Sequence, residues 1–245
     1  MLNIRQKDLI KQHALEDAPN ECCGVIDSDG NVIKCKNTSP FPEEAFQINF
    51  SEIKNVNEVH SFYHSHPVSL EFSMTDKYYA HKRNIPCVVY SVDKDDFAIY
   101  TPTVFFELPL LGREFITNEV DCITLVRDYY GRNLNIYIPD VIHKIRQIEP
   151  NEWPNREEFW GYNRRSNREF VKIFEARGFK EVSTPQKHDV ILSDNGVVKA
   201  LSHCAIYIND SEIMHHPYPS DSTTETLNSF SRNSKIVYMR HKLML

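Results

Sequence analysis

The first hundred residues combine helical and extended patterns of apolar positions. Apolar residues recur at helical spacing over residues 4–16 and predict an amphipathic helix. The stretch EVHSFYHSH, residues 58–66, alternates with a period of two and predicts a strand. A serine or threonine cap predicts a second helix over residues 73–84. Two pairs of strands, each joined by a short polar turn, are expected over residues 22–37 and 87–101.

The second half of the chain repeats this order of helices first and strands later. The stretch CITLVRDYYG predicts a helix over residues 122–131 that ends at Gly131. The charged segment over residues 155–179 predicts another helix, which ends at Gly178. Several short strands are expected over residues 188–216, where apolar runs alternate with turn residues.

Between these halves, over residues 101–112, the pattern has two prolines and no clear period. We therefore predict two domains, over residues 1–104 and 105–245. Because each half has helices followed by strands, the predicted fold class is α+β, with no internal repeat.

Composition narrows the class of protein without naming its chemistry. The 245 residues allow two domains that each bury a core. The net charge of −6 gives no electrostatic basis for binding nucleic acid. No segment has the pattern of a signal peptide or the length of a membrane span, so we expect synthesis in a cytoplasm without general export. The six cysteines match no zinc ribbon and are interpreted mostly as buried small side chains.

The stretch FYHSHPVSLEFSMTD brings two imidazoles and a carboxylate close together in the sequence. His64 and His66 are two residues apart on the predicted strand, so their rings share one face. Asp76 falls in the first turn of the helix that follows. Two imidazoles and one carboxylate are a common catalytic zinc set that leaves a fourth position for water. The alternative is that all three are satisfied polar residues at a strand edge.

The order HSHP and then SxxD resembles the metalloprotease motif of the JAMM/MPN (Mov34) family. That family adds a glutamate just before a strand, and the stretch PNECCGVI supplies it as Glu21. The resemblance covers about the first hundred residues and implies a mixed β-sheet with helices. It also implies that His64, His66 and Asp76 bind Zn²⁺. Glu21 would then be the general base, and Ser73 would help to stabilise the oxyanion.

One cysteine in the second half has the setting of a nucleophile. Cys122 begins a predicted helix, where the positive end of the helix dipole favours the thiolate. A thiolate works best beside a histidine. The stretch SHCAIYINDSEIMHH predicts a hairpin with its turn at residues 209–210, so His203 begins one strand and His215 and His216 end the other. The alternative is that Cys122 is a buried structural cysteine.

The stretches DCITLVRDYY and HCAIYIND resemble the motifs of the NlpC/P60 cysteine peptidases, over about residues 106–245. The resemblance implies a papain-like domain with Cys122 as nucleophile, His203 as base and His215 as the third member. A two-residue turn would instead place His216 opposite His203. The family spacing therefore implies a loop with an odd number of residues or a bulge in the hairpin, and we expect His215, with His216 as the alternative.

The pairing of these two domains, with ELPLLGREF before the cysteine and IMHHPY near the end, resembles tail assembly proteins of lambda-like tailed phages. The resemblance implies phage tail tip proteins and bacterial peptidoglycan peptides as partners, and a place in the host cytoplasm during assembly or at the virion tail tip. The metal domain would be a zinc-dependent peptidase without a defined target. The alternative is a structural or partner-binding tail protein in which one or both sites are inactive.

Overall fold

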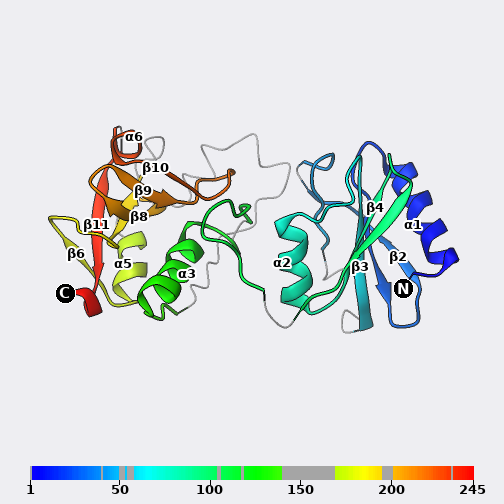
Figure 1. The fold of residues 1–245 in the computed structure, drawn as a ribbon, viewed down its shortest axis with the longest axis horizontal. Coiled ribbons are helices and arrows are strands. Elements are labelled where there is room, and N and C mark those ends of the chain that lie inside the picture. The colour runs from blue at the N-terminus through cyan, green and yellow to red at the C-terminus, as the bar shows by residue number, and fades with distance from the viewer. Residues whose placement is uncertain are drawn as a thin grey trace. The chain divides into compact units, whose positions relative to one another are not determined.

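A computed structural model describes most of the chain. The described residues are 2–39, 41–49, 53, 58–103, 106–116, 119–139, 169–194, 201–232 and 234–245. The chain divides into two compact units, Met1–Leu108 and Pro109–Leu245 (Figure 1). The predicted boundary between residues 104 and 105 lies outside the described residues.

The first unit is built on a five-stranded mixed sheet. Its strands lie in the order β2-β1-β3-β4-β5, and only β3 and β4 run parallel among these neighbours. The elements are α1 (Ile4–Asp17), β1 (Cys23–Asp27), β2 (Val32–Cys35), β3 (Val59–His66), α2 (Met74–Arg83), β4 (Cys87–Ser91) and β5 (Asp96–Tyr100).

The two helices of this unit cover opposite faces of the sheet (Figure 1). Ile10 of α1 packs in one cluster with Tyr63 and Val88. Ala80 of α2 packs in another cluster with Phe62, the strand neighbour of Tyr63. Since successive strand residues point to opposite faces, the alternation along β3 supplies both layers of core. Each fully buried large apolar side chain stabilises the unit by about 1.5–3 kcal/mol.

The second unit is built on a six-stranded antiparallel sheet in the order β10-β9-β8-β7-β11-β6. The elements are α3 (Cys122–Leu134), α5 (Glu169–Glu175), β6 (Phe179–Val182), β7 (Val190–Ser193), β8 (His203–Asn209), β9 (Glu212–His215), β10 (Thr223–Thr226), α6 (Leu227–Ser231), β11 (Ile236–His241) and the 3₁₀ helix η4 (Lys242–Met244).

Helices also cover both faces of this second sheet. Leu125 of α3 and Phe174 of α5 pack in one core cluster with Ile206 of β8. Ala205, the neighbour of Ile206 on the strand, belongs to a second cluster against which Phe230 of α6 packs. Helices with one mixed and one antiparallel sheet confirm the predicted α+β class. Within the described part of the chain, no helix is long and apolar enough to cross a membrane.

Two predicted helix ends differ from the structure. The helix predicted to end at Gly131 continues to Leu134, because the cap is made one turn later: Asn135 adopts φ 53° and its N–H bonds the Tyr130 carbonyl. The charged helix predicted to end at Gly178 ends at Glu175 instead. Its described part is α5, and residues 155–168 lie outside the described residues. The strands β6, β10 and β11 were not predicted from the sequence.

Candidate active sites

Strand β3 and the start of α2 bring the three predicted metal ligands together. The Nε2 atoms of His64 and His66 are 2.9 Å apart. Asp76 places one carboxylate oxygen 3.3 Å from Nε2 of His64 and the other 4.0 Å from Nε2 of His66. His64 and Asp76 are almost fully buried, and the His66 side chain is 15% exposed. The three donors therefore converge on one point that is reached from the side of His66.

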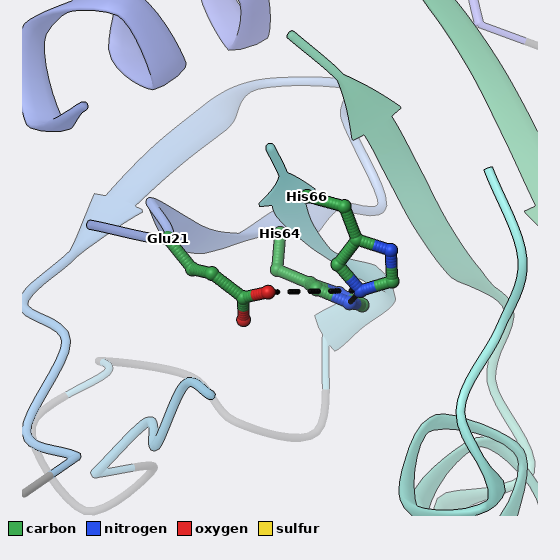
Figure 2. Close-up of side chains that lie close together, drawn as sticks. All are labelled: Glu21, His64 and His66. Carbon is green, nitrogen blue, oxygen red and sulfur yellow. Dashed lines mark hydrogen bonds and ion pairs between the residues drawn. The ribbon is translucent and has the colours of Figure 1, made fainter. Parts of the chain in front are cut away.

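Glu21 joins this cluster from the segment just before β1. Strand β1 pairs with β3 so that Cys23 lies opposite His64, and continuing that register places Glu21 beside His66. The Glu21 carboxylate lies 3.7 Å from Nε2 of His66 (Figure 2). Its backbone is fixed by bonds to the Pro42 carbonyl and from the Asn37 side-chain amide.

Burial sets the protonation of this cluster. Burial raises the pKa of Glu21 to about 7, and the charge of Asp76 adds to this effect while that of His64 opposes it. Burial, followed by the charge of His64, lowers the pKa of His66, so its ring is neutral at pH 7. Burial disfavours ionised Asp76, but the charge and bond of His64 and bonds to Ser73 outweigh it and lower that pKa. A carboxyl group with a pKa near neutrality is suited to proton transfer.

Ser73 fixes the position of Asp76 through a capping box. The Ser73 hydroxyl oxygen accepts the Asp76 N–H at 3.0 Å, and the Asp76 carboxylate accepts the Ser73 N–H at 2.8 Å. Asp76 therefore occupies the third position of α2, one of the places where an acidic side chain satisfies a free helix N–H. In this arrangement the hydroxyl of Ser73 uses a lone pair, and its proton stays available for donation.

Two further residues hold the ring of His64 and were not predicted from the sequence. Phe46 stacks on this ring with centroids 4.2 Å apart and an interplanar angle of 24°. The Cys87 thiol lies 3.8 Å from Nδ1 of His64, on the side opposite Nε2. These contacts orient Nε2 toward Asp76. Nothing in the local motif indicates them, because Phe46 and Cys87 reach the ring from other segments of the fold.

The donor set fits a zinc ion. Zinc bound tetrahedrally at about 2.0–2.1 Å places its ligand atoms roughly 3.3 Å apart. The separations of 2.9 Å between the two imidazoles and 3.3 Å between His64 and Asp76 are close to this value, and the 4.0 Å between His66 and Asp76 is longer. Two groups of candidate ligand atoms lie within 4.8 Å of one another: Glu21 with His64 and His66, and His64 with Asp76 and Cys87. Imidazole and carboxylate are donors that zinc prefers, and the binding of zinc by His64, His66 and Asp76 stays a prediction.

In the second unit, Cys122 is the first residue of α3. Asp121 caps this helix, and its side chain accepts the N–H groups of Ile123 and Thr124 at 3.0 and 2.9 Å. Thr124 completes the capping box, because its hydroxyl accepts the Asp121 N–H at 2.7 Å. The residues on both sides of Cys122 thus fix the start of the helix, and Cys122 as a whole residue is 9% exposed.

Neighbouring side chains lower the pKa of the Cys122 thiol. A hydrogen bond from Cys204, and then the bond and charge of His203, lower the pKa of Cys122 to about 5 against the opposing effect of burial. Burial is the main cause that raises the pKa of the Cys204 thiol, and the hydrogen bond with Cys122 raises this pKa further. The sequence led us to expect Cys204 in the core, and it is fully buried there. Its contact with the nucleophile was missed.

The hairpin of β8 and β9 brings His203 and His215 together. Nε2 of His203 lies 3.1 Å from Nδ1 of His215. The predicted turn at residues 209–210 is wrong by one residue, because Asn209 pairs with Glu212 across a turn at residues 210–211. The register shifts between Tyr207 and Asn209, so Ala205 pairs with His215, whereas an unshifted register from the Asn209–Glu212 pair would place Ile206 there. This bulge moves His215 onto the face of His203, because a shift of one residue exchanges the faces of a strand.

His216, the alternative third member, lies elsewhere. It is fully buried and meets the ring of Phe115 edge to face, with centroids 4.9 Å apart. Burial lowers the pKa of both His215 and His216 to about 4, with the charges of His203 and Arg113, respectively, as the next contribution. His215 is therefore a neutral ring beside His203 at pH 7, as an orienting group should be.

Similarity to known proteins agrees with this geometry. Residues 112–241, more than half of the chain, match the NlpC/P60 family. The chain belongs to the NlpC/P60 family. In this family member the match begins ahead of Cys122 and extends past His215, so it includes the whole second site. Residues 5–103 match the prokaryotic homologs of the JAB domain, which confirms the predicted order of a JAMM/MPN-type domain followed by an NlpC/P60 domain.

Most of the chain also matches a relative along most of that relative's length. It is 28% identical over 225 residues to the tail tip assembly protein K of Escherichia phage N15, with 88% of this chain and 86% of that protein covered. This similarity confirms the predicted relationship to phage tail assembly proteins. A crystal structure of an NlpC/P60 family protein from Bacillus cereus ATCC 10987 is 14% identical with a TM-score of 0.30, over 92% of this chain and 65% of that one.

Proposed function

We propose that the C-terminal domain is a cysteine peptidase that hydrolyses peptide bonds in bacterial cell-wall peptidoglycan. The observation that carries the proposal is the ordered contact of three side chains. Cys122 begins α3, Cys204 and then His203 lower the pKa of its thiol, and Nε2 of His203 lies 3.1 Å from Nδ1 of His215. A nucleophile, a base and an orienting group in this order are the requirement of covalent acyl transfer.

The reaction follows from the protonation of these groups. The thiolate of Cys122 attacks the peptide carbonyl and forms a tetrahedral intermediate. The imidazolium of His203 donates its proton to the leaving amine, the C–N bond breaks, and a thioester remains on Cys122. His203, now neutral, removes a proton from water, which attacks the thioester and releases the carboxylate product and the thiolate. His215 keeps the ring of His203 aligned through both steps.

The N-terminal domain is proposed to be a zinc-dependent peptidase with a target still to be found. His64, His66 and Asp76 would hold the Zn²⁺, which supplies Lewis acidity when bound. Glu21 accepts a proton from the attacking water and delivers it to the leaving amine, for which a pKa near 7 is suited. The hydroxyl proton of Ser73, which the capping box does not use, is donated to the oxyanion.

Both activities are assigned to the assembly of a phage tail or the entry of its genome. The similarity to a tail tip assembly protein over most of the chain supports this setting. Phage tail tip proteins are the proposed partners, and the host cytoplasm during assembly and the virion tail tip are the proposed locations. Local opening of peptidoglycan would give a tail or its DNA a path through the wall. The net charge of −6 supports the expectation that nucleic acid is not a direct ligand.

The test is digestion of purified peptidoglycan by the full chain, followed by mass spectrometry of the released muropeptides. Wild type and His64→Ala are expected to release the same new peptide ends, and Cys122→Ala none. Cys35→Ala, which removes a half-buried thiol of the other domain, is the matched control and keeps full activity. Unchanged muropeptides with wild type would support the alternative of a structural tail protein. Products that persist in Cys122→Ala and vanish in His64→Ala would assign the cutting to the metal domain.

A further inference from the structure

The hydrogen-bonded chain of the second site does not stop at His215. Nε2 of His215 lies 3.2 Å from a carboxylate oxygen of Glu225, on strand β10. Strand β10 pairs with β9 so that Thr223 lies opposite His215. Glu225 is two residues further along, and its side chain therefore returns to the same face of the sheet. The side chain of His215 is 7% exposed and that of Glu225 is 35% exposed, so the contact is partly shielded from water.

An aromatic side chain covers the two imidazoles. The ring of Phe230, from α6, lies 5.8 Å from the centroid of His203 and 5.5 Å from that of His215. Its apolar surface limits the water that can replace a hydrogen bond between the rings. If the Glu225 carboxylate is removed, water therefore does not readily replace its contact with His215.

The direction of each hydrogen bond follows from these contacts. Imidazolium His203 donates through Nε2, so Nδ1 of His215 must accept and carry no proton. The neutral ring of His215 then carries its proton on Nε2, which faces the Glu225 carboxylate. In the other tautomer, the lone pair on Nε2 would face that carboxylate and be repelled by it. A carboxylate in this position thus selects the tautomer of His215 that stabilises imidazolium at His203.

Building on the proposed cysteine peptidase activity, we infer that Glu225 is a positioning residue that fixes the tautomer of His215 and so sustains the thiolate–imidazolium pair of Cys122 and His203. The charged and titratable groups around the pair come from several elements. Asp121 lies beside the thiol at the start of α3, Cys204 bonds it from β8, and His216 follows His215 after β9. Among the residues that the structure describes, the carboxylate recorded in contact with Nε2 of His215 is that of Glu225.

The first measurement reads the tautomer directly. Long-range ¹H–¹⁵N correlation spectra of the full chain labelled at histidine distinguish protonated from unprotonated ring nitrogens, and His215→Ala assigns the signals. Wild type is expected to carry the His215 proton on Nε2 at pH 7. Glu225→Gln keeps an oxygen that can accept this proton and should retain the tautomer, whereas Glu225→Ala should show a mixture. A wild-type ring protonated on Nδ1 would overturn the inference.

The second measurement reads the thiolate without requiring catalysis. The rate of iodoacetamide alkylation at Cys122 is followed against pH by peptide mass spectrometry. Glu225→Ala is expected to raise the apparent pKa of Cys122 by about half a unit to one unit, and Glu225→Gln by less. The matched control is Glu212→Gln, which removes an acidic charge from β9 at its contact with Asn209 and should leave the profile unchanged.

The outcomes separate this inference from the proposed activity. Where wild type digests peptidoglycan, Glu225→Ala is expected to lower kcat about tenfold with little change in KM. If wild type releases no muropeptides, the proposed function fails, and the tautomer and alkylation profile still decide the role of Glu225. If Glu225→Ala does not fold, Glu225→Gln carries the test, because a role in the tautomer requires its profile to lie between wild type and His215→Ala. Identical alkylation profiles for Glu225→Gln, Glu212→Gln and wild type, with an unselected His215 tautomer, would refute the inference.

Discussion

Replacing Asp76 by asparagine separates the two roles that this residue has in the structure. Its carboxylate is a proposed zinc ligand, and one of its oxygens accepts the Ser73 N–H as part of the cap of α2. Asparagine keeps an oxygen for the cap and removes the charged donor. We therefore expect Asp76→Asn to lose zinc binding while the metal-free protein keeps most of its stability.

The size of the effect follows from the donor count. Structural zinc sites have apparent binding free energies of about 10–16 kcal/mol, so one donor of four accounts for on the order of 3 kcal/mol. The expected loss in zinc affinity is then roughly a hundredfold.

The opposite pattern is expected for Ser73→Ala, which removes the hydroxyl that accepts the Asp76 N–H at 3.0 Å. Loss of an N-cap destabilises a helix by about 1 kcal/mol and leaves all three ligands in place.

The assay pairs competition against a chromophoric zinc chelator with urea denaturation of the metal-free chain. Asp76→Asn should change the first and Ser73→Ala the second, with zinc affinity of Ser73→Ala within about tenfold of wild type. Zinc affinity that is unchanged in Asp76→Asn would refute the assignment of the ligands. Equal losses of affinity in both variants would show that the helix cap, and not the carboxylate as donor, controls the site.

Three further predictions follow from single contacts. The alkylation rate of Cys122 should be half-maximal near pH 5 and flat from pH 6 to 8, because below its pKa the thiol regains its proton; a rate that climbs about tenfold per pH unit to pH 8 would contradict this. Gly24→Ala should destabilise the chain by about 1–3 kcal/mol in urea denaturation, since its Cβ would lie 2.4 Å from a backbone oxygen of β2. Gly131→Ala, with open space around a helical glycine, is the control and should be neutral or stabilising. Asp128→Ala should cost about 3–5 kcal/mol, because it removes the carboxylate 2.8 Å from fully buried Arg113; a loss below about 1 kcal/mol would contradict it.

The parts of the molecule that were predictable are those set by short-range patterns. The period-two alternation of β3 placed His64 and His66 on one face, and their rings are in contact. A serine or threonine cap was predicted to open a helix near residue 73, and α2 begins directly after Ser73, which is its cap. The end of α3 was missed because glycine is tolerated inside a helix, so Gly131 by itself does not require a cap.

The contacts that were missed all depend on register between distant segments. Cys87 reaches His64 because β4 pairs in parallel with β3, and Glu225 reaches His215 because β10 pairs with β9. Neither pairing leaves a mark in the local sequence, since a strand pattern gives the face of a residue and not its partner. The bulge in the β8–β9 hairpin is similar. The family spacing implied either an odd-length loop or a bulge, and periodicity favoured a regular turn with His216 as the partner of His203.

The two sites use the same local device in different ways. Both α2 and α3 begin with a capping box, in which the N-cap side chain accepts the N–H of the third helical residue. In α2 that third residue, Asp76, is itself the proposed ligand, so the cap and the metal site share one side chain. In α3 the third residue, Thr124, completes the cap, and the first residue, Cys122, keeps its side chain outside the box. Removing the Asp76 side chain should therefore disturb zinc binding and helix stability together in the first domain, whereas in the second domain the thiol depends on partners from β8 that the cap does not supply.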